Sequence, residues 1–217
     1  MPDSQAHFSP EQEETLAALT SPERIQAYLD GLQYPSGPEN RCPAKVMAEG
    51  KAHCLDGALF AAFALRRLGH PPVIVDLLPE PGSDDDHVLV IFRCGRGMGA
   101  LAKSNFTGLR LREPVYRSLR ELVMSYFDFY FNMDGVKTLR FYSPPVRLER
   151  LDHLGWMASD AGVDAIEKHL YTLRKIPLLT PEMIAGLSPA DPLTYRAGTL
   201  VVNPDGLYKP HSPHQSA

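Results

Sequence analysis

Three positions in this sequence could together perform nucleophilic catalysis: Cys54, His87 and one of the adjacent residues Ser104 and Asn105. In such chemistry a thiolate attacks an acyl carbon, an imidazole takes the thiol proton, and a third side chain orients the imidazole. Cys54 opens an apolar, alanine-rich run, which predicts the first turn of a helix, where unpaired N–H groups and the helix dipole lower a thiol pKa. The alternative is that Cys54 is a small apolar residue of a buried helix.

His87 follows three aspartates and begins an apolar run, which predicts the first position of a strand at the rim of the core. There it could face a cleft, or it could be a surface residue solvated by the aspartates. A hairpin with a three-residue loop at 95–97 places Asn105 opposite His87, whereas a four-residue loop at 94–97 places Ser104 there. Asn105 is favoured because its carbonyl can accept a hydrogen bond from the imidazole; the alternative is that this polar pair caps a strand end.

The elements that must position these residues follow from capping, periodicity and turn residues. Helices are expected at about 9–19, 21–31, 53–68, 114–131 and 164–174, and strands at 73–78, 88–92, 100–106 and 138–142. The sequence predicts one domain spanning 1–217, with a helical arm at 1–40, a core at 41–150, and a last helix and turn-rich tail at 151–217.

Composition narrows the functional classes. The 217 residues are 44% hydrophobic and 22% charged, with a net charge of -4, which is typical of a folded protein and disfavours nucleic-acid binding. An odd set of cysteines (Cys42, Cys54 and Cys94) without CxxC spacing predicts free thiols. With no leader or membrane-spanning pattern, the expected location is the cytoplasm, without membrane contact. No cofactor-binding motif is present, and the oligomeric state is left open.

The segment 41–105 resembles the transglutaminase-like superfamily. The resemblance is carried by His53-Cys54-Leu-Asp-Gly-Ala58, Leu68-Gly69, Asp86-His87-Val-Leu-Val and Lys103-Ser104-Asn105, and 112–143 is similar to a bacterial subgroup. The resemblance implies an α+β fold with a papain/transglutaminase-like core and flanking helices. In this core a buried helix that begins at the nucleophilic Cys54 packs on an antiparallel sheet, and the sheet carries His87 and Asn105. The sequence departs from the family in having Met98 in place of a tryptophan and no aspartate near Asn105.

These residues and the resemblance predict a cysteine-dependent amide or acyl hydrolase or transferase that forms an acyl-thioester, with hydrolysis favoured by analogy. The second oxyanion donor, beside the Cys54 N–H, could be Gln33 or Tyr34. The alternative is a catalytically inactive binding or scaffold module of the same fold, because the family's aspartate and tryptophan are missing.

The expected partner is a peptide or amide-bearing substrate, which could be acidic because residues 103–147 hold eight lysines and arginines against four acids. A solvated helix face is the other interpretation of this charge run. A zinc site built from His53, Cys54, His87 and the aspartates at 84–86 is disfavoured, since neighbouring helix residues diverge by ~100° around the axis. No metal is therefore expected.

Overall fold

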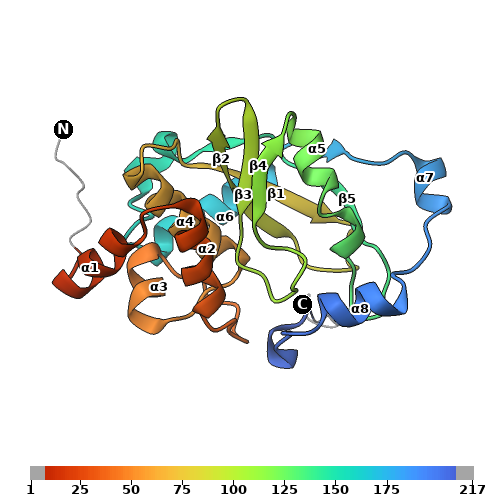
Figure 1. The fold of residues 1–217 in the computed structure, drawn as a ribbon, viewed down its shortest axis with the longest axis horizontal. Coiled ribbons are helices and arrows are strands. Elements are labelled where there is room, and N and C mark those ends of the chain that lie inside the picture. Colours follow the sequence, from red (N-terminus) through yellow and green to blue (C-terminus); the bar gives the residue numbers. More distant parts are fainter. Residues whose placement is uncertain (1–7, 209–217) are drawn as a thin grey trace, which may run out of the picture.

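A seven-stranded sheet divides the molecule in the computed structural model, which describes residues 8–208 (Figure 1). The strand order is β4-β3-β2-β1-β5-β7, with β6 also pairing with β1, and every pairing is antiparallel. The chain is thus a mixed α/β protein built on an antiparallel sheet. The strands are β1 (Val73–Pro79), β2 (His87–Cys94), β3 (Gly97–Leu101), β4 (Arg112–Tyr116), β5 (Leu139–Tyr142), β6 (Val146–Arg147) and β7 (Ile176–Pro177).

The helices begin where capping residues satisfy their free N–H groups. Ser9 and Gln12 form a capping box at the first helix, and Ser21, Ser118 and Ser159 each accept a hydrogen bond from the first turn of later helices. The α-helices are α1 (Pro10–Ala18), α2 (Pro22–Gly31), α3 (Pro43–Glu49), α4 (Cys54–Arg67), α5 (Leu119–Met124), α6 (Asp160–Thr172), α7 (Pro181–Ala185) and α8 (Pro192–Gly198), and the 3-10 helices are η1 (Phe127–Phe129), η2 (Leu148–Leu154) and η3 (Pro204–Gly206).

Two hydrophobic cores lie on opposite faces of the sheet. Helix α4 packs on one face, and its core includes Val88 and Val90 of β2 and the apolar residues of α1, α2, α3 and α6. The other core contains Leu89 and Ile91 of β2 and the side chains of α5 and the segment that follows it. Consecutive residues of β2 therefore enter different cores, as a strand covered on both sides requires.

Most of the predicted elements are present. The helices expected at 9–19, 21–31, 53–68 and 164–174, and the strands at 73–78, 88–92 and 138–142, agree with the observed elements to within a few residues. Helix α3, strands β6 and β7, and the short helices α7 and α8 were not predicted. They are two to seven residues long, too short for a periodic pattern to reveal.

Two local predictions were wrong. The helix expected from Pro114 is instead edge strand β4 followed by the six-residue α5, because a proline is tolerated at a sheet edge and Ser118 supplies a helix cap further on. The β2–β3 hairpin has a two-residue turn, since Cys94 pairs with Gly97. Strand β3 consequently runs from Gly97 to Leu101 rather than through 100–106.

Among the helices of residues 8–208, none is both long and apolar enough to cross a bilayer.

Candidate functional site

Cys54 is the first residue of α4, as predicted, and it lies half-buried against the start of β2. Its Sγ is 3.7 Å from the carbonyl oxygen of Asp86, and the backbone N–H of Val88 donates to the sulfur. Burial raises the pKa of the Cys54 thiol well above its ordinary value, and the nearby Asp86 carboxylate raises it further. The expected lowering by the helix start is outweighed, so the thiol is protonated at neutral pH.

His87 lies on the other face of the sheet. Its side chain is 4% exposed, its ring stands edge-on to Tyr126 and Tyr130, and its Nε2 is 2.8 Å from the carbonyl oxygen of Leu109. That bond requires the proton to be on Nε2. Burial, reinforced by the charge of Arg112, lowers the pKa of His87 to about 4, so the ring is neutral at pH 7.

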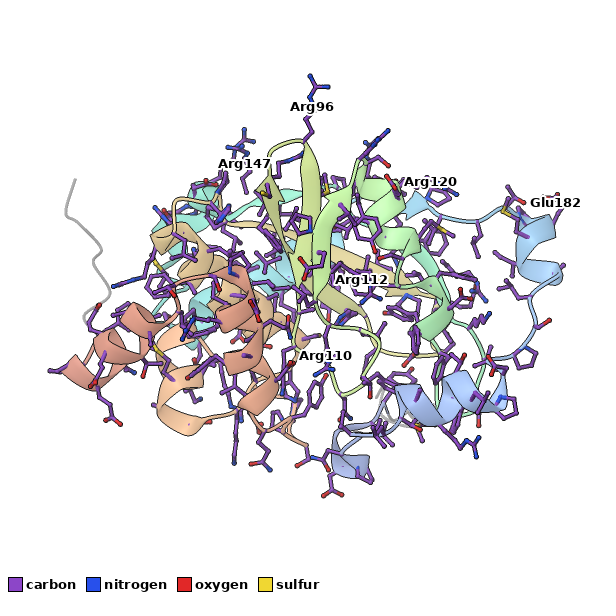
Figure 2. The ribbon with its side chains drawn as sticks, viewed as in Figure 1. Arg96, Arg110, Arg112, Arg120, Arg147 and Glu182 are labelled. Carbon is purple, nitrogen blue, oxygen red and sulfur yellow. The ribbon has the colours of Figure 1, made fainter. Side chains whose placement is uncertain are left out.

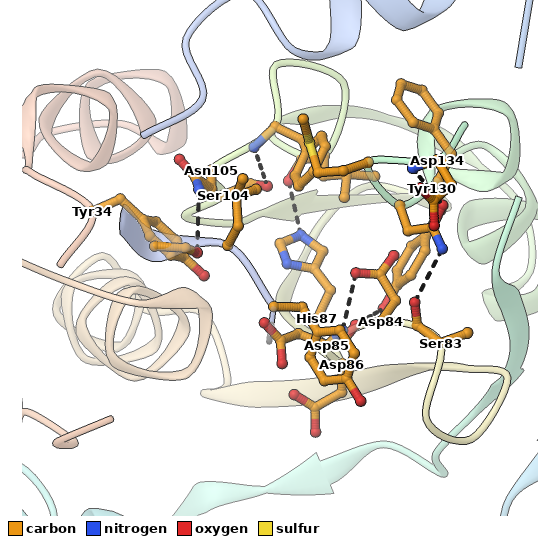
Figure 3. A pocket seen from close by; sticks show the side chains of 18 residues that line it. Tyr34, Ser83, Asp84, Asp85, Asp86, His87, Ser104, Asn105, Tyr130 and Asp134 are labelled. Atoms are coloured by element: carbon orange, nitrogen blue, oxygen red, sulfur yellow. Dashed lines mark hydrogen bonds between the residues drawn. The ribbon is translucent and has the colours of Figure 1, made fainter. Parts of the chain in front are cut away.

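The expected Cys54–His87 pair is not formed. Residues 86 and 88 of the chain contact the sulfur, while the ring of residue 87 between them lies against Tyr126 and Tyr130 of the opposite core. The cavity bordered by Cys54 does not include His87, and the cavity that holds His87 does not include Cys54 (Figure 3). The backbone at the start of β2 thus lies between the two groups that the expected mechanism needs in contact.

Asn105 and Ser104 border the His87 cavity, but their hydrogen bonds go elsewhere in the described part of the chain. Asn105 Nδ2 donates to the carbonyl oxygens of Asn203 and Gly206, and its Oδ1 accepts from the N–H of Asn203 at 2.8 Å. Ser104 Oγ accepts from the N–H of Phe106. Asn105 therefore ties the segment around η3 to the core, and the expected Asn105–imidazole hydrogen bond is absent from residues 8–208. The observed hairpin register corresponds to the Ser104 alternative, but β3 ends before either residue could pair with His87.

The two oxyanion candidates are placed differently. Gln33 is exposed and forms a backbone bridge with Lys51. Tyr34 borders the Cys54 cavity, and its ring stands edge-on to the imidazole of His53 at 5.3 Å between ring centroids. Burial raises the pKa of Tyr34 well above its ordinary value, with Cys54 and the neighbouring acids adding to the shift. Of the two, only Tyr34 lies beside the cysteine.

Three separate hollows of about 150, 270 and 340 Å³ adjoin around the start of β2, and Tyr34 and Asp85 border all of them. They are together named the acidic cleft, within which His87 and Cys54 border different hollows. The smallest contains His87, and Figure 3 shows its imidazole among the side chains of the loop before β2. The largest contains Cys54, Glu167 and Tyr171. The acids of the cleft come from four segments of the chain and are Asp84, Asp85, Asp86, Asp134, Glu167 and Asp205. Among the described residues, no lysine or arginine lines it.

Several of these carboxyl groups hold their protons unusually tightly. Burial raises the pKa of Asp84 and of Asp86 to about 6, although Thr138 Oγ1 donates a 2.8 Å hydrogen bond to Asp84. Asp76, opposite Val88 on β1, is 1% exposed, and neither of its carboxyl oxygens has a hydrogen-bond partner within residues 8–208. Burial and the charge of Asp86 raise the pKa of Asp76 well above its ordinary value.

The eight basic residues between 103 and 147 do not together line one groove beside Cys54. Most are held by groups of the protein itself: Lys103 Nζ donates to the carbonyl oxygens of Leu29 and Leu32, and Arg112 lies over the ring of Tyr126. The others engaged in this way are Arg110 with Asp30, Arg120 with the Leu178 carbonyl, Lys137 with Asp128 and Arg140 with Glu80. An acidic substrate therefore has no basic cleft near Cys54.

Sequence reasoning missed the residues that give the cleft its charge. The sequence suggests a role for the aspartates at 84–86 only in solvating His87 or in a disfavoured zinc site, and Glu167 and Asp205 lie far from them in the chain. One signal was available, because Asp76 interrupts an otherwise apolar strand and such a carboxylate must be buried or flank a site. In the part of the chain that the structure describes, no group of three or more His, Cys, Asp or Glu residues is arranged to hold a metal ion.

Comparison with known proteins adds no family assignment: no protein-family model matches the sequence, and no curated protein matches it significantly.

Proposed function

We propose that this protein is a transglutaminase-like binding module, without turnover, whose acidic cleft takes a ligand that carries an amine or guanidinium cation. The observation that carries the proposal is the lining of the cleft, where six acids gather and no lysine or arginine is found among the described residues. Such a surface concentrates cations and excludes anions. The family likeness rests on an N-terminal cysteine helix packed against an antiparallel sheet.

The placement of the three predicted catalytic residues favours binding over turnover. Each is engaged in a role that packing explains: Cys54 is a protonated, half-buried thiol, His87 is a neutral imidazole bonded to Leu109, and Asn105 anchors a distant loop. A cysteine nucleophile needs a base within hydrogen-bond reach, and His87 does not occupy that position.

Calorimetric titration with spermidine tests this proposal. Because Asp84 and Asp86 both have a pKa of about 6, they are ionised at pH 7.5 and mostly protonated at pH 5. If the cation binds only the ionised form of one of them, its affinity falls about tenfold between these pH values. The double variant Asp84→Asn/Asp86→Asn should bind weakly at both pH values.

The matched control is Glu23→Gln/Glu113→Gln, which removes two exposed carboxylates from α2 and β4, outside the cleft lining. It should bind spermidine as the unmodified protein does. Undetectable binding at pH 7.5, or an equal loss in the control, would refute the proposal.

A second candidate function is cysteine-dependent acyl transfer with Asp86, not His87, as the base. It is favoured by one observation: Cys54 and Asp86 border the same 340 Å³ cavity, beside the N–H of Val88. The Asp86 carboxylate would take the thiol proton as sulfur bonds to the acyl carbon, and would pass that proton to the leaving group as its bond to the acyl carbon breaks. Water or an amine would then release the acyl group from the thioester.

Alkylation with iodoacetamide separates the two functions. Cys94 is exposed and serves as an internal reference, and Cys42 is buried. The binding module predicts that Cys94 reacts fastest at every pH from 5 to 9. Faster modification of Cys54 than of Cys94 near pH 6.5, slowed by Asp86→Asn, would instead favour the enzyme.

A further inference from the structure

A second hollow, of about 510 Å³, lies over the hairpin end of the sheet and away from the acidic cleft. Its floor is formed by paired residues of neighbouring strands: Val73 lies opposite Ile91, and Met98 lies opposite Arg93. Directly paired residues project from the same face of a sheet. Ile91 and Met98 belong to the α5 core, so this is the face that α5 covers, and Leu119 at the start of that helix borders the hollow.

Three arginines surround the apolar floor. Arg93 lies near the end of β2, Arg147 lies on β6 opposite Val73, and Arg150 lies in η2. All three are exposed, and within residues 8–208 none forms an ion pair. Figure 2 shows Arg147 on the same side of the molecule as Arg96 at the hairpin tip.

The three arginines lie together over one hollow and share the lack of an ion pair within residues 8–208. Some arginines elsewhere in the protein do have a carboxylate partner, as Arg66 has Asp152 and Arg67 has Glu13, each at 2.8 Å. No aspartate or glutamate lines the 510 Å³ hollow among the described residues. Three guanidinium groups that have no ion pair with any described residue lie above an apolar floor. They complement an anion that carries a hydrophobic body, because guanidinium pairs with carboxylate through two parallel hydrogen bonds.

We infer that this hollow binds a small anionic amphiphile, which is a carboxylate attached to an aliphatic chain. The hollow is named the arginine groove and is defined by Val73, Ile91, Arg93, Met98, Arg147 and Arg150. Its volume falls in the range of small-molecule sites. The two prolines that border it, Pro71 and Pro145, help to shape a concave site suited to one compact ligand. The carboxylate would lie among the guanidinium groups and the chain along Val73, Ile91 and Met98.

Calorimetry with decanoate, below its micelle concentration, tests this inference. Decanol supplies the chain without the charge, and acetate supplies the charge without the chain. We expect both to bind at least about tenfold more weakly than decanoate, because each lacks one half of the recognition. The variant Arg147→Glu/Arg150→Glu should lose decanoate binding by a similar factor.

The matched control is Arg24→Glu/Arg196→Glu, which reverses two exposed charges on α2 and α8. It should bind decanoate normally, and the groove variant should still bind spermidine, which separates this inference from the acidic cleft. Absence of decanoate binding, or equal weakening in the control, would overturn it. Binding to phosphatidylglycerol vesicles or to a poly-glutamate peptide without binding to decanoate would also overturn it.

Discussion

The protonation of His87 decides whether its imidazole belongs to the core or to a catalytic pair. With a pKa of about 4 in the folded protein against an ordinary value of about 6.5, the folded state binds the proton less tightly than the unfolded chain. The resulting stability is fully present above pH 6.5 and is lost as the pH falls toward 4. Each unit by which the pKa is displaced corresponds to about 1.4 kcal/mol, so the complete loss of unfolding free energy is about 3 kcal/mol. About 2 kcal/mol of it is lost between pH 7.5 and 5.

The substitution His87→Gln removes this titration and keeps an amide that can donate to the Leu109 carbonyl. Other groups also titrate in this range, and the raised pKa values of Asp84 and Asp86 act in the opposite direction, so the measured quantity is a difference between proteins. Urea unfolding at pH 7.5, 6.5, 5.5 and 5 can be followed by Trp156, the single tryptophan, which is fully buried. Between pH 7.5 and 5, the variant should lose about 2 kcal/mol less of its unfolding free energy than the unmodified protein.

The matched control is His169→Gln, which replaces an exposed histidine of α6, and the effect of His87→Gln is measured against it. A histidine paired with a Cys54 thiolate would have a raised pKa, and its contribution would be present at low pH and lost as the pH rises. A variant that loses more stability than the unmodified protein on acidification would therefore refute the buried, neutral His87 described here.

Two further substitutions test the packing around the cysteine helix. Asp76→Asn should raise the free energy of unfolding at pH 8, and this gain should shrink toward pH 4. The reason is that a raised carboxyl pKa makes the folded state progressively less favourable as the pH rises. A difference between the two proteins that does not change with pH would contradict this. Gly57→Ala should lower the unfolding free energy, measured by urea titration, by about 1–3 kcal/mol, because the new Cβ would lie 2.3 Å from Cβ of Lys103. Its control is Gly31→Ala, whose new Cβ would have no atom within 4 Å and which should therefore be neutral or stabilising.

Local signals predicted the elements better than their relative placement. The cap at Ser9, the alanine-rich run after Cys54 and the β-branched run after Pro72 each locate an element correctly, because capping, propensity and turn chemistry act over a few residues. The acidic cleft depends on contacts between distant segments, such as Glu167 of α6 with the loop before β2. No local pattern encodes such a meeting.

The side of the sheet occupied by His87 could not be predicted for a related reason. In β2 both alternating sets of residues are apolar and buried, so hydrophobic periodicity does not distinguish the two faces. The hairpin loop sets the register, and the observed two-residue turn at Gly95-Arg96 differs from the three- and four-residue loops that the sequence predicts. The sequence therefore predicts that His87 lies at the start of the strand, but it does not predict the face of the sheet on which the His87 side chain lies.

A small local adjustment cannot restore the missing Cys54–His87 pair. Turning His87 toward α4 would require β2 to shift by one residue, which would move Val88 and Val90 out of the α4 core and bring Leu89 into it. Each of these side chains is at most 2% exposed, and burying such a side chain is worth about 1.5–3 kcal/mol. The register of the whole strand thus holds the imidazole away from the sulfur, and any chemistry at Cys54 must use the groups already beside it, Asp86 first among them.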